Sequence, residues 1–239
     1  MTPRGARFRL RPAWLVVTIA ACAGFVALGN WQSRRAEEKL AAQRDADARA
    51  AAAPVRLPAT IVAAGEYAGR RVVAAGEYVP AHTVLIDNRV HKGIVGYYVV
   101  TPLRLEGGPV HVLVNRGWVA AGPRRDRLPE VSTPPGPQRV EGLAVAPGRP
   151  PYALAPDVAP GPVRQHLDIE RVAADSGLRL QPVFVQETSA APDGLVRVWE
   201  RPDAGVNTHR AYAVQWYGLG ILTVVVYVVL GFRRAGDPA

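Results

Sequence analysis

The chain has 239 residues, of which 29 are basic and 20 acidic, giving a formal net charge of +9. Six basic residues and one acidic residue lie in the first 12 and last seven positions, so the remainder, with 23 basic and 19 acidic residues, carries only +4. A basic excess that flanks apolar runs is typical of membrane proteins, and nucleic acid is therefore not an expected partner. The single cysteine excludes a disulfide framework and a Cys-rich metal module.

Two long apolar runs predict two transmembrane helices. Residues 13–29 carry no charge, and residues 212–232 are almost entirely apolar. Both runs approach or exceed the length that a helix needs to cross a bilayer, about 20 residues. Trp14 and Trp31 stand at the two ends of the first run, as interfacial aromatic residues do.

The first run also fits two other interpretations. A basic segment before a stretch rich in small residues is typical of a cleaved signal peptide, and Ile19-Ala20-Ala21-Cys22 resembles a lipoprotein cleavage site. However, seven further apolar residues follow the cysteine, where a lipoprotein begins a polar tether. We therefore favour an uncleaved anchor in which Cys22 is a buried, unmodified packing residue.

Two spans place both termini on one side of the membrane. Four arginines and no acid precede the first span, and Arg233 and Arg234 follow the second, which favours cytoplasmic termini. Arg34, Arg35 and Lys39 on the other side weaken this bias. The short segment before the first span leaves little room for a mitochondrial presequence, so we expect a bacterial inner (cytoplasmic) membrane and a periplasmic main domain.

The segment between the spans predicts an α+β membrane protein with a β-rich extracytoplasmic domain, either an antiparallel sheet or a small barrel. We expect strands at residues 83–86, 96–105, 109–118, 139–145 and 182–186, and one short helix at 169–176 with Asp168 as N-cap and Gly177 after its end. The expected segments are a cytoplasmic tail (1–12), transmembrane helix (13–31), helical stalk (32–53), β-rich domain (54–206), transmembrane helix (207–232) and cytoplasmic tail (233–239).

A short repeat lies near the start of this domain, where residues 61–67 return as residues 72–78. Two copies are too few for a solenoid, so we expect a pair of strands. Residues 123–162 are rich in proline and glycine, and predict surface loops around one strand.

The sequence contains no nucleophile elbow, phosphate-binding glycine loop, HExxH motif or CxxC motif, so an enzyme is not expected. Four of the five histidines, at positions 82, 91, 111 and 166, lack metal-ligand spacing and are expected to pack or to face solvent.

His209 differs because it lies at the outer end of the second span. On a helix, which Asn207 is expected to cap, His209, Tyr212, Ala213 and Trp216 share one face. An imidazole beside two aromatic rings could hold a flat, apolar metallo-cofactor as an axial ligand. The alternative is an interfacial belt of amphipathic rings without a ligand.

An amide inside a membrane helix usually has a partner, and Gln215 lies about one turn further along the second span. We expect its counterpart to be Gln32 or Trp31 on the first helix.

Both membrane junctions and two strands resemble the Surfeit locus protein 1 (Surf/Shy) family of cytochrome oxidase assembly factors. The matching segments, in chain order, are Leu28-Gly29-Asn30-Trp31-Gln32-Ser33-Arg34-Arg35, Asp87-Asn88-Arg89, Gly93-Ile94-Val95-Gly96-Tyr97 with Thr101-Pro102-Leu103, Leu113-Val114-Asn115-Arg116-Gly117-Trp118, and Asn207-Thr208-His209-Arg210-Ala211-Tyr212-Ala213-Val214-Gln215-Trp216. The resemblance covers nearly the whole chain. It departs from the family pattern at Glu38 and Thr208.

The resemblance implies an assembly factor for haem-copper oxidases without turnover chemistry. It also implies that haem a binds through His209 and is passed to cytochrome c oxidase subunit I, with haem a synthase as a second candidate partner. The expected haem-site residues are His209 as iron ligand with Tyr212, Trp216, Trp31, Gln32 and Arg35. The alternative is a cofactor-free scaffold that stabilises oxidase assembly intermediates in the lipid bilayer.

Overall fold

The computed structural model describes residues 7–8, 10–122, 127–148, 161–199 and 205–233. The chain divides into two compact units. Residues 1–45 with 202–239 form a helical unit, and residues 46–201 form a unit built on a β-sheet.

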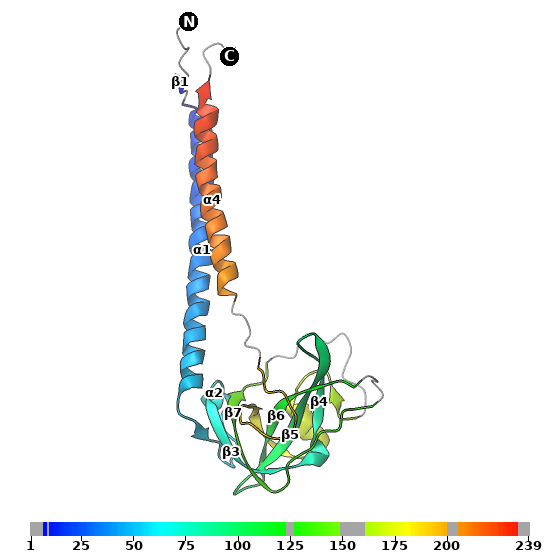
Figure 1. The fold of residues 1–239 in the computed structure, drawn as a ribbon. Helices are drawn as coiled ribbons and strands as arrows, with labels where there is room; N and C mark the ends of the chain where they lie inside the picture. Colours follow the sequence, from blue (N-terminus) through cyan, green and yellow to red (C-terminus); the bar gives the residue numbers. More distant parts are fainter. Residues whose placement is uncertain (1–6, 9, 123–126, 149–160, 200–204, 234–239) are drawn as a thin grey trace. The chain divides into compact units, whose positions relative to one another are not determined.

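Two long helices, α1 (Pro12–Ala51) and α4 (Val206–Gly231), lie side by side in opposite directions (Figure 1). At the end of this helix pair that carries the start of α1 and the end of α4, β1 (Arg7–Phe8) pairs antiparallel with β10 (Phe232–Arg233). Both helices are long and apolar enough to cross a membrane, and only 6% of each apolar window is buried inside the structure. A core helix of a water-soluble protein would be largely covered, so this exposed apolar surface is consistent with a membrane protein.

α1 is a continuous helix of 40 residues that ends shortly before Pro54, so the apolar run and the charged segment after it share one helix. The division of this helix into a membrane span and a stalk stays a prediction. The predicted N-cap of the second helix was wrong. The cap is Gly205, which adopts a left-handed conformation with φ of 66°, and Asn207 lies inside the first turn.

Small residues allow α1 and α4 to approach closely at the middle of this hairpin. Gly29 and Gly220 are buried, and a Cβ atom on Gly29 would overlap the ring of Tyr217. The Sγ atom of Cys22 lies 3.5 Å from the carbonyl oxygen of Gly220. Cys22 therefore packs against α4, half-buried rather than buried as expected, and its unmodified state stays a prediction. Close backbone approach of this kind is how membrane helices gain packing contacts.

The sheet unit contains eight strands in the order β2-β3-β7-β9-β6-β5-β4-β8 within the described residues. The strands are β2 (Val55–Arg56), β3 (Arg71–Tyr78), β4 (Val84–His91), β5 (Ile94–Leu105), β6 (Val110–Ala120), β7 (Pro137–Val145), β8 (Val163–Arg164) and β9 (Arg179–Glu187). The helical elements are α2 (Ala64–Tyr67), η1 (Pro80–His82) and α3 (Ile169–Ser176).

An additional pairing between β3 and β5 closes five of these strands, β3-β7-β9-β6-β5, into a ring. The small-barrel prediction is thus confirmed, but the sheet is mixed rather than purely antiparallel, because β2–β3, β4–β8 and β6–β9 are parallel pairs. The main core is valine- and leucine-rich and draws on all five strands of the ring; it includes Val72, Leu103, Val112, Val140 and Val183. β-branched side chains suit such a packed, pleated interior.

The five predicted strands all exist, with longer boundaries. The short helix α3 is also confirmed, because Asp168 accepts a hydrogen bond from the Arg171 amide and Gly177 follows in a left-handed conformation. The paired-strand prediction for the repeat was wrong. The first copy contains the single-turn helix α2, whereas the second forms β3, which pairs with β2, β5 and β7. The region 123–162 was predicted to form surface loops around one strand, and β7 is that strand. Residues 123–126 and 149–160 of this region lie outside the described residues.

Candidate functional site

The helical hairpin brings His209 and Gln32 together, although 177 positions separate them in sequence. The Nδ1 atom of His209 lies 2.6 Å from the Oε1 atom of Gln32, at a partly buried position. His209 belongs to the first turns of α4 and Gln32 to the middle of α1. This contact corrects the expectation that Gln32 pairs with Gln215, which is exposed on α4.

The contact selects one tautomer of the imidazole. A glutamine Oε1 atom can only accept a hydrogen bond, so Nδ1 of His209 carries the proton and donates it. In the neutral imidazole this arrangement leaves the lone pair on Nε2, and no described residue makes a hydrogen bond to that atom. A neutral histidine with Nδ1–H held by an oxygen and Nε2 available is the usual arrangement of a metal-ligating imidazole.

The other predicted site residues divide into packed and exposed groups. Trp216 stacks on Phe25 of α1, with ring centroids 5.9 Å apart and planes inclined by 23°. Tyr212 and Trp31 are 49% and 47% exposed, and neither is buried against the partner helix. The guanidinium of Arg35 pairs with Glu38 at 2.9 Å. The hairpin therefore fixes His209, Gln32 and Trp216, and leaves the rings of Tyr212 and Trp31 about half exposed.

Sequence analysis missed a second polar contact between the helices. The hydroxyl of Tyr217 donates to Oδ1 of Asn30 at 2.8 Å and lies 3.4 Å from Oγ of Ser33. Asn30 and Ser33 flank Gln32 on α1. The sequence feature that could have predicted this contact is the set of polar side chains at both membrane junctions, because such groups commonly form hydrogen bonds between paired membrane helices.

The other four histidines belong to the sheet unit, whereas His209 belongs to the helical unit. His111 is buried on β6, and burial lowers the pKa of its imidazole, which favours the neutral form. His166 lines a polar cavity of about 440 Å3 with Asp87, Asn88 and Arg89. Among the described residues, no group of three or more His, Cys, Asp or Glu side chains is arranged to hold a metal ion.

A buried charge network explains one of the sequence motifs noted above. Arg116, 1% exposed, contacts Asp193 at 3.1 Å, and Asp193 also contacts Arg197 at 2.6 Å. Arg116 precedes Gly117 at a β-bulge opposite Val99, and Gly117 has φ of 143°, where a Cβ atom would crowd Leu195. The motif thus places Arg116 of β6 in a buried ion pair with Asp193, in the segment after β9. Its role is in stability rather than in cofactor binding.

Comparison with known proteins supplies the family context. The model of the SURF1 family matches residues 19–221, a range that includes Gln32 and His209. The chain is similar to a SURF1-like protein of Monosiga brevicollis, with 27% identity over 231 residues, covering 87% of this chain and 83% of the relative. It is also similar to a SURF1-like protein of Drosophila melanogaster (30% identity, 88% and 74% covered) and to human Surfeit locus protein 1 (28% identity, 88% and 74% covered).

Proposed function

The chain belongs to the SURF1 family of oxidase assembly factors, which is not a catalytic family, and from this premise we propose that it binds haem a through His209 and aids its insertion into cytochrome c oxidase subunit I. The observation that carries the proposal is the 2.6 Å contact between His209 Nδ1 and Gln32 Oε1. It directs the imidazole and leaves Nε2 as a donor for iron.

The residues beside His209 fit a flat apolar group with acidic substituents. Tyr212 and Trp31, which lie on the same helices as His209 and Gln32, are about half exposed and offer aromatic surface, while Trp216 packs on Phe25. Arg34 is exposed, and Arg35 makes only a surface pair with Glu38, so guanidinium groups are available for carboxylates such as propionates. Haem a, when bound, supplies the iron centre that the oxidase needs; this chain's residues bind it, orient it and limit its exposure to water.

The proposed site requires the hairpin to lie in a membrane. The two apolar helices are consistent with a membrane protein, and their exposed apolar surface supports insertion. We place both termini on the cytoplasmic side and the sheet unit on the opposite side, because the arginine-rich segments flank the terminal ends of the spans. The bacterial inner membrane stays a prediction from the sequence, since the relatives named above are eukaryotic.

The competing function is a scaffold that stabilises oxidase assembly intermediates without a cofactor. It needs the same hairpin and the same sheet unit, but no iron ligand. The haem proposal also includes two partners: subunit I, which would receive the haem, and a haem a synthase, which would donate it.

The test is the absorption spectrum of full-length protein purified in detergent from cells that also make haem a. A Soret band and α-band of haem a that co-elute with the protein are the expected result. The same protein free of haem after purification from those cells, although folded and membrane-bound, would favour the scaffold.

A further inference from the structure

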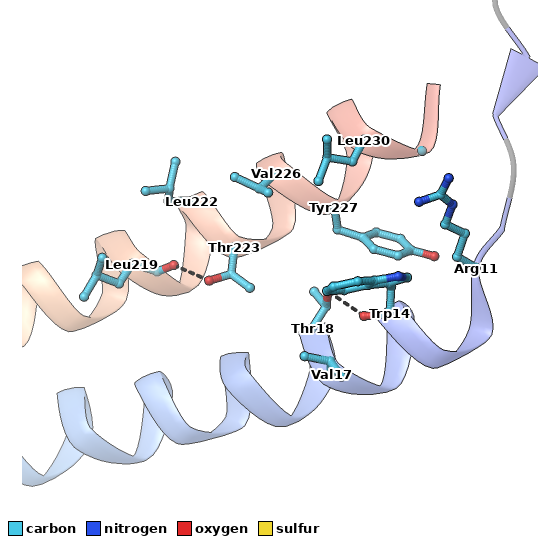
Figure 2. A pocket seen from close by; sticks show the side chains of 11 residues that line it. Arg11, Trp14, Val17, Thr18, Leu219, Leu222, Thr223, Val226, Tyr227 and Leu230 are labelled. Carbon is cyan, nitrogen blue, oxygen red and sulfur yellow. Dashed lines mark hydrogen bonds between the residues drawn. The ribbon is translucent and has the colours of Figure 1, made fainter. Parts of the chain in front are cut away.

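A cavity of about 360 Å3 lies between α1 and α4 near the end of the hairpin that carries β1 and β10. Its walls are mainly apolar and include Trp14, Val17, Leu222, Val226 and Leu230, with Arg11 at one end (Figure 2). The volume lies within the range of about 300–1,000 Å3 that is usual for ligand pockets. On α4 the lining extends from Leu219 to Gly231, about 18 Å at 1.5 Å per residue.

The cavity exists because the residues that separate α1 from α4 change along the hairpin, from small at its middle to large near Arg11. At its middle, Gly29 and Gly220 allow close contact. Towards Arg11 the facing residues are Thr18 and Thr223 and then the large rings of Trp14 and Tyr227, which lie between the helices (Figure 2). Rings of this size hold the backbones apart, and the shorter side chains next to them cannot fill the space.

The cavity suits an apolar occupant better than water. The hydroxyl of Thr18 donates to the Trp14 carbonyl at 2.8 Å, and that of Thr223 donates to the Leu219 carbonyl at 2.8 Å. Both hydroxyls are thus bonded within their own helices, whereas a buried water needs two to four polar partners. Leu222, Val226 and Leu230 are between 46% and 64% exposed, so the cavity is open to a surrounding bilayer.

Positive charge gathers at the end of the cavity that Arg11 lines. Arg11 has no ion-pair partner among the described residues, and Figure 2 shows its guanidinium beside the ring of Tyr227. Antiparallel pairing of β1 with β10 places Arg7 opposite Arg233 at this same end. Basic pockets between membrane helices are typical binding sites for anionic lipid headgroups.

We propose that this cavity binds one anionic phospholipid, with an acyl chain between α1 and α4 and the headgroup phosphate at Arg11. The inference rests on the proposed membrane insertion of the hairpin, but not on haem binding at His209. The length of the lining matches about half of the 30 Å hydrocarbon core, which is the depth that the chains of one leaflet occupy. The charge at one end favours a lipid over a second copy of the apolar hairpin, which would bring more arginine to the same place.

The experiment is native mass spectrometry of the full chain in detergent, titrated with phosphatidylglycerol or with phosphatidylcholine of identical acyl chains. We expect tighter binding of phosphatidylglycerol. Arg11→Gln should reduce that preference about fivefold, as expected for one basic residue near an anionic headgroup. Val226→Trp should weaken binding of both lipids because the indole fills the cavity. The matched controls are Arg44→Gln, an exposed arginine elsewhere on α1, and Val225→Trp, next to the cavity residue but not in the lining.

Equal affinity for the two lipids would overturn the headgroup assignment. Lipid binding unchanged by Val226→Trp, or a loss of dimers rather than of lipid in that variant, would overturn the lipid site, the latter in favour of a second copy. Carbonate extraction and the haem spectrum are recorded on the same preparations. Release by carbonate would refute membrane insertion, and a missing haem spectrum with intact lipid binding would refute only the haem proposal.

Discussion

The Nδ1 atom of His209 and the Oε1 atom of Gln32 lie 2.6 Å apart across the helical hairpin, so the amide fixes both the orientation and the tautomer of the imidazole. In the proposed haem site Gln32 would contact the iron-ligating histidine rather than the iron, and its effect on the cofactor would therefore be that of a positioning residue.

Replacing Gln32 tests this positioning role. Gln32→Leu removes the acceptor of the Nδ1 proton, and we expect haem affinity to fall about 10- to 100-fold without disappearing. Gln32→Glu retains an acceptor and should recover most of the affinity while lowering the haem reduction potential, because a carboxylate makes the imidazole a stronger donor. Haem titration followed by potentiometry measures both effects. Gln215→Leu is the control, since that amide is exposed on α4; equal losses in the two variants would contradict the positioning role.

Much of this arrangement follows from the sequence, for physical reasons that differ between its parts. The spans were predictable from uninterrupted apolar runs, and α3 from Asp168 and Gly177, because caps are local features. The paired-strand prediction for the repeat was wrong because two nearly identical segments form α2 and β3 in different tertiary surroundings. The partner of Gln32 was missed because helix register in a hairpin depends on side-chain packing, here the fit of Tyr217 over Gly29.

The packing of the hairpin can be tested by cross-linking. A Cβ atom at Gly220 would lie 3.7 Å from the Cβ of Phe25, a separation that suits a disulfide, so Gly220→Cys with Phe25→Cys should form an intramolecular disulfide on mild oxidation in a Cys22→Ala background. Ile221→Cys in place of Gly220→Cys is the control, because Ile221 is adjacent but 68% exposed. The measurement is the gel mobility of protein cleaved between the helices, before and after reduction. Efficient cross-linking only with Ile221→Cys would show a different helix register.

The buried charge network should dominate the stability of the sheet unit. Asp193→Asn leaves Arg116 without its buried counter-charge and Arg197 with Glu187 alone, and we expect a loss of about 3–5 kcal/mol in the free energy of unfolding at neutral pH. Asp175→Asn, at a carboxylate that is 41% exposed and pairs with Arg164 and Arg171, should cost less than about 1 kcal/mol. Urea unfolding of the full chain in detergent, followed by near-UV circular dichroism, measures both losses.

The effect of Asp193 should depend on pH in a defined direction. Burial raises the pKa of its carboxyl, but hydrogen bonds from Arg197 and the Leu195 amide outweigh burial and hold the pKa below its ordinary value of 3.8. The stabilisation is therefore complete above the unfolded pKa, and it is lost as the pH falls through 3.8 towards the lower folded pKa. The difference between wild type and Asp193→Asn should shrink in that window; a constant difference down to the lowest pH would contradict the charge-based explanation.

Reporter fusions test the proposed topology. Alkaline phosphatase fused after Gly136, in the sheet unit, should be active in a bacterial host, and a fusion after Ala239 should be inactive, because the enzyme folds only outside the cytoplasm. An inactive Gly136 fusion that is nevertheless expressed and membrane-bound, or an active Ala239 fusion, would reverse the orientation that the arginine-rich ends favour.

The central claim is that His209 ligates haem iron, and the most direct measurement is the Soret absorbance per mole of purified protein. We predict that His209→Ala loses most of its bound haem with the sheet unit still folded by circular dichroism, because one directional metal bond is removed from otherwise diffuse apolar contacts. His166→Ala, at a histidine of the sheet unit, should keep the wild-type absorbance. Full haem occupancy with an unaltered spectrum in His209→Ala would contradict the account and favour an aromatic belt at the membrane surface without a ligand.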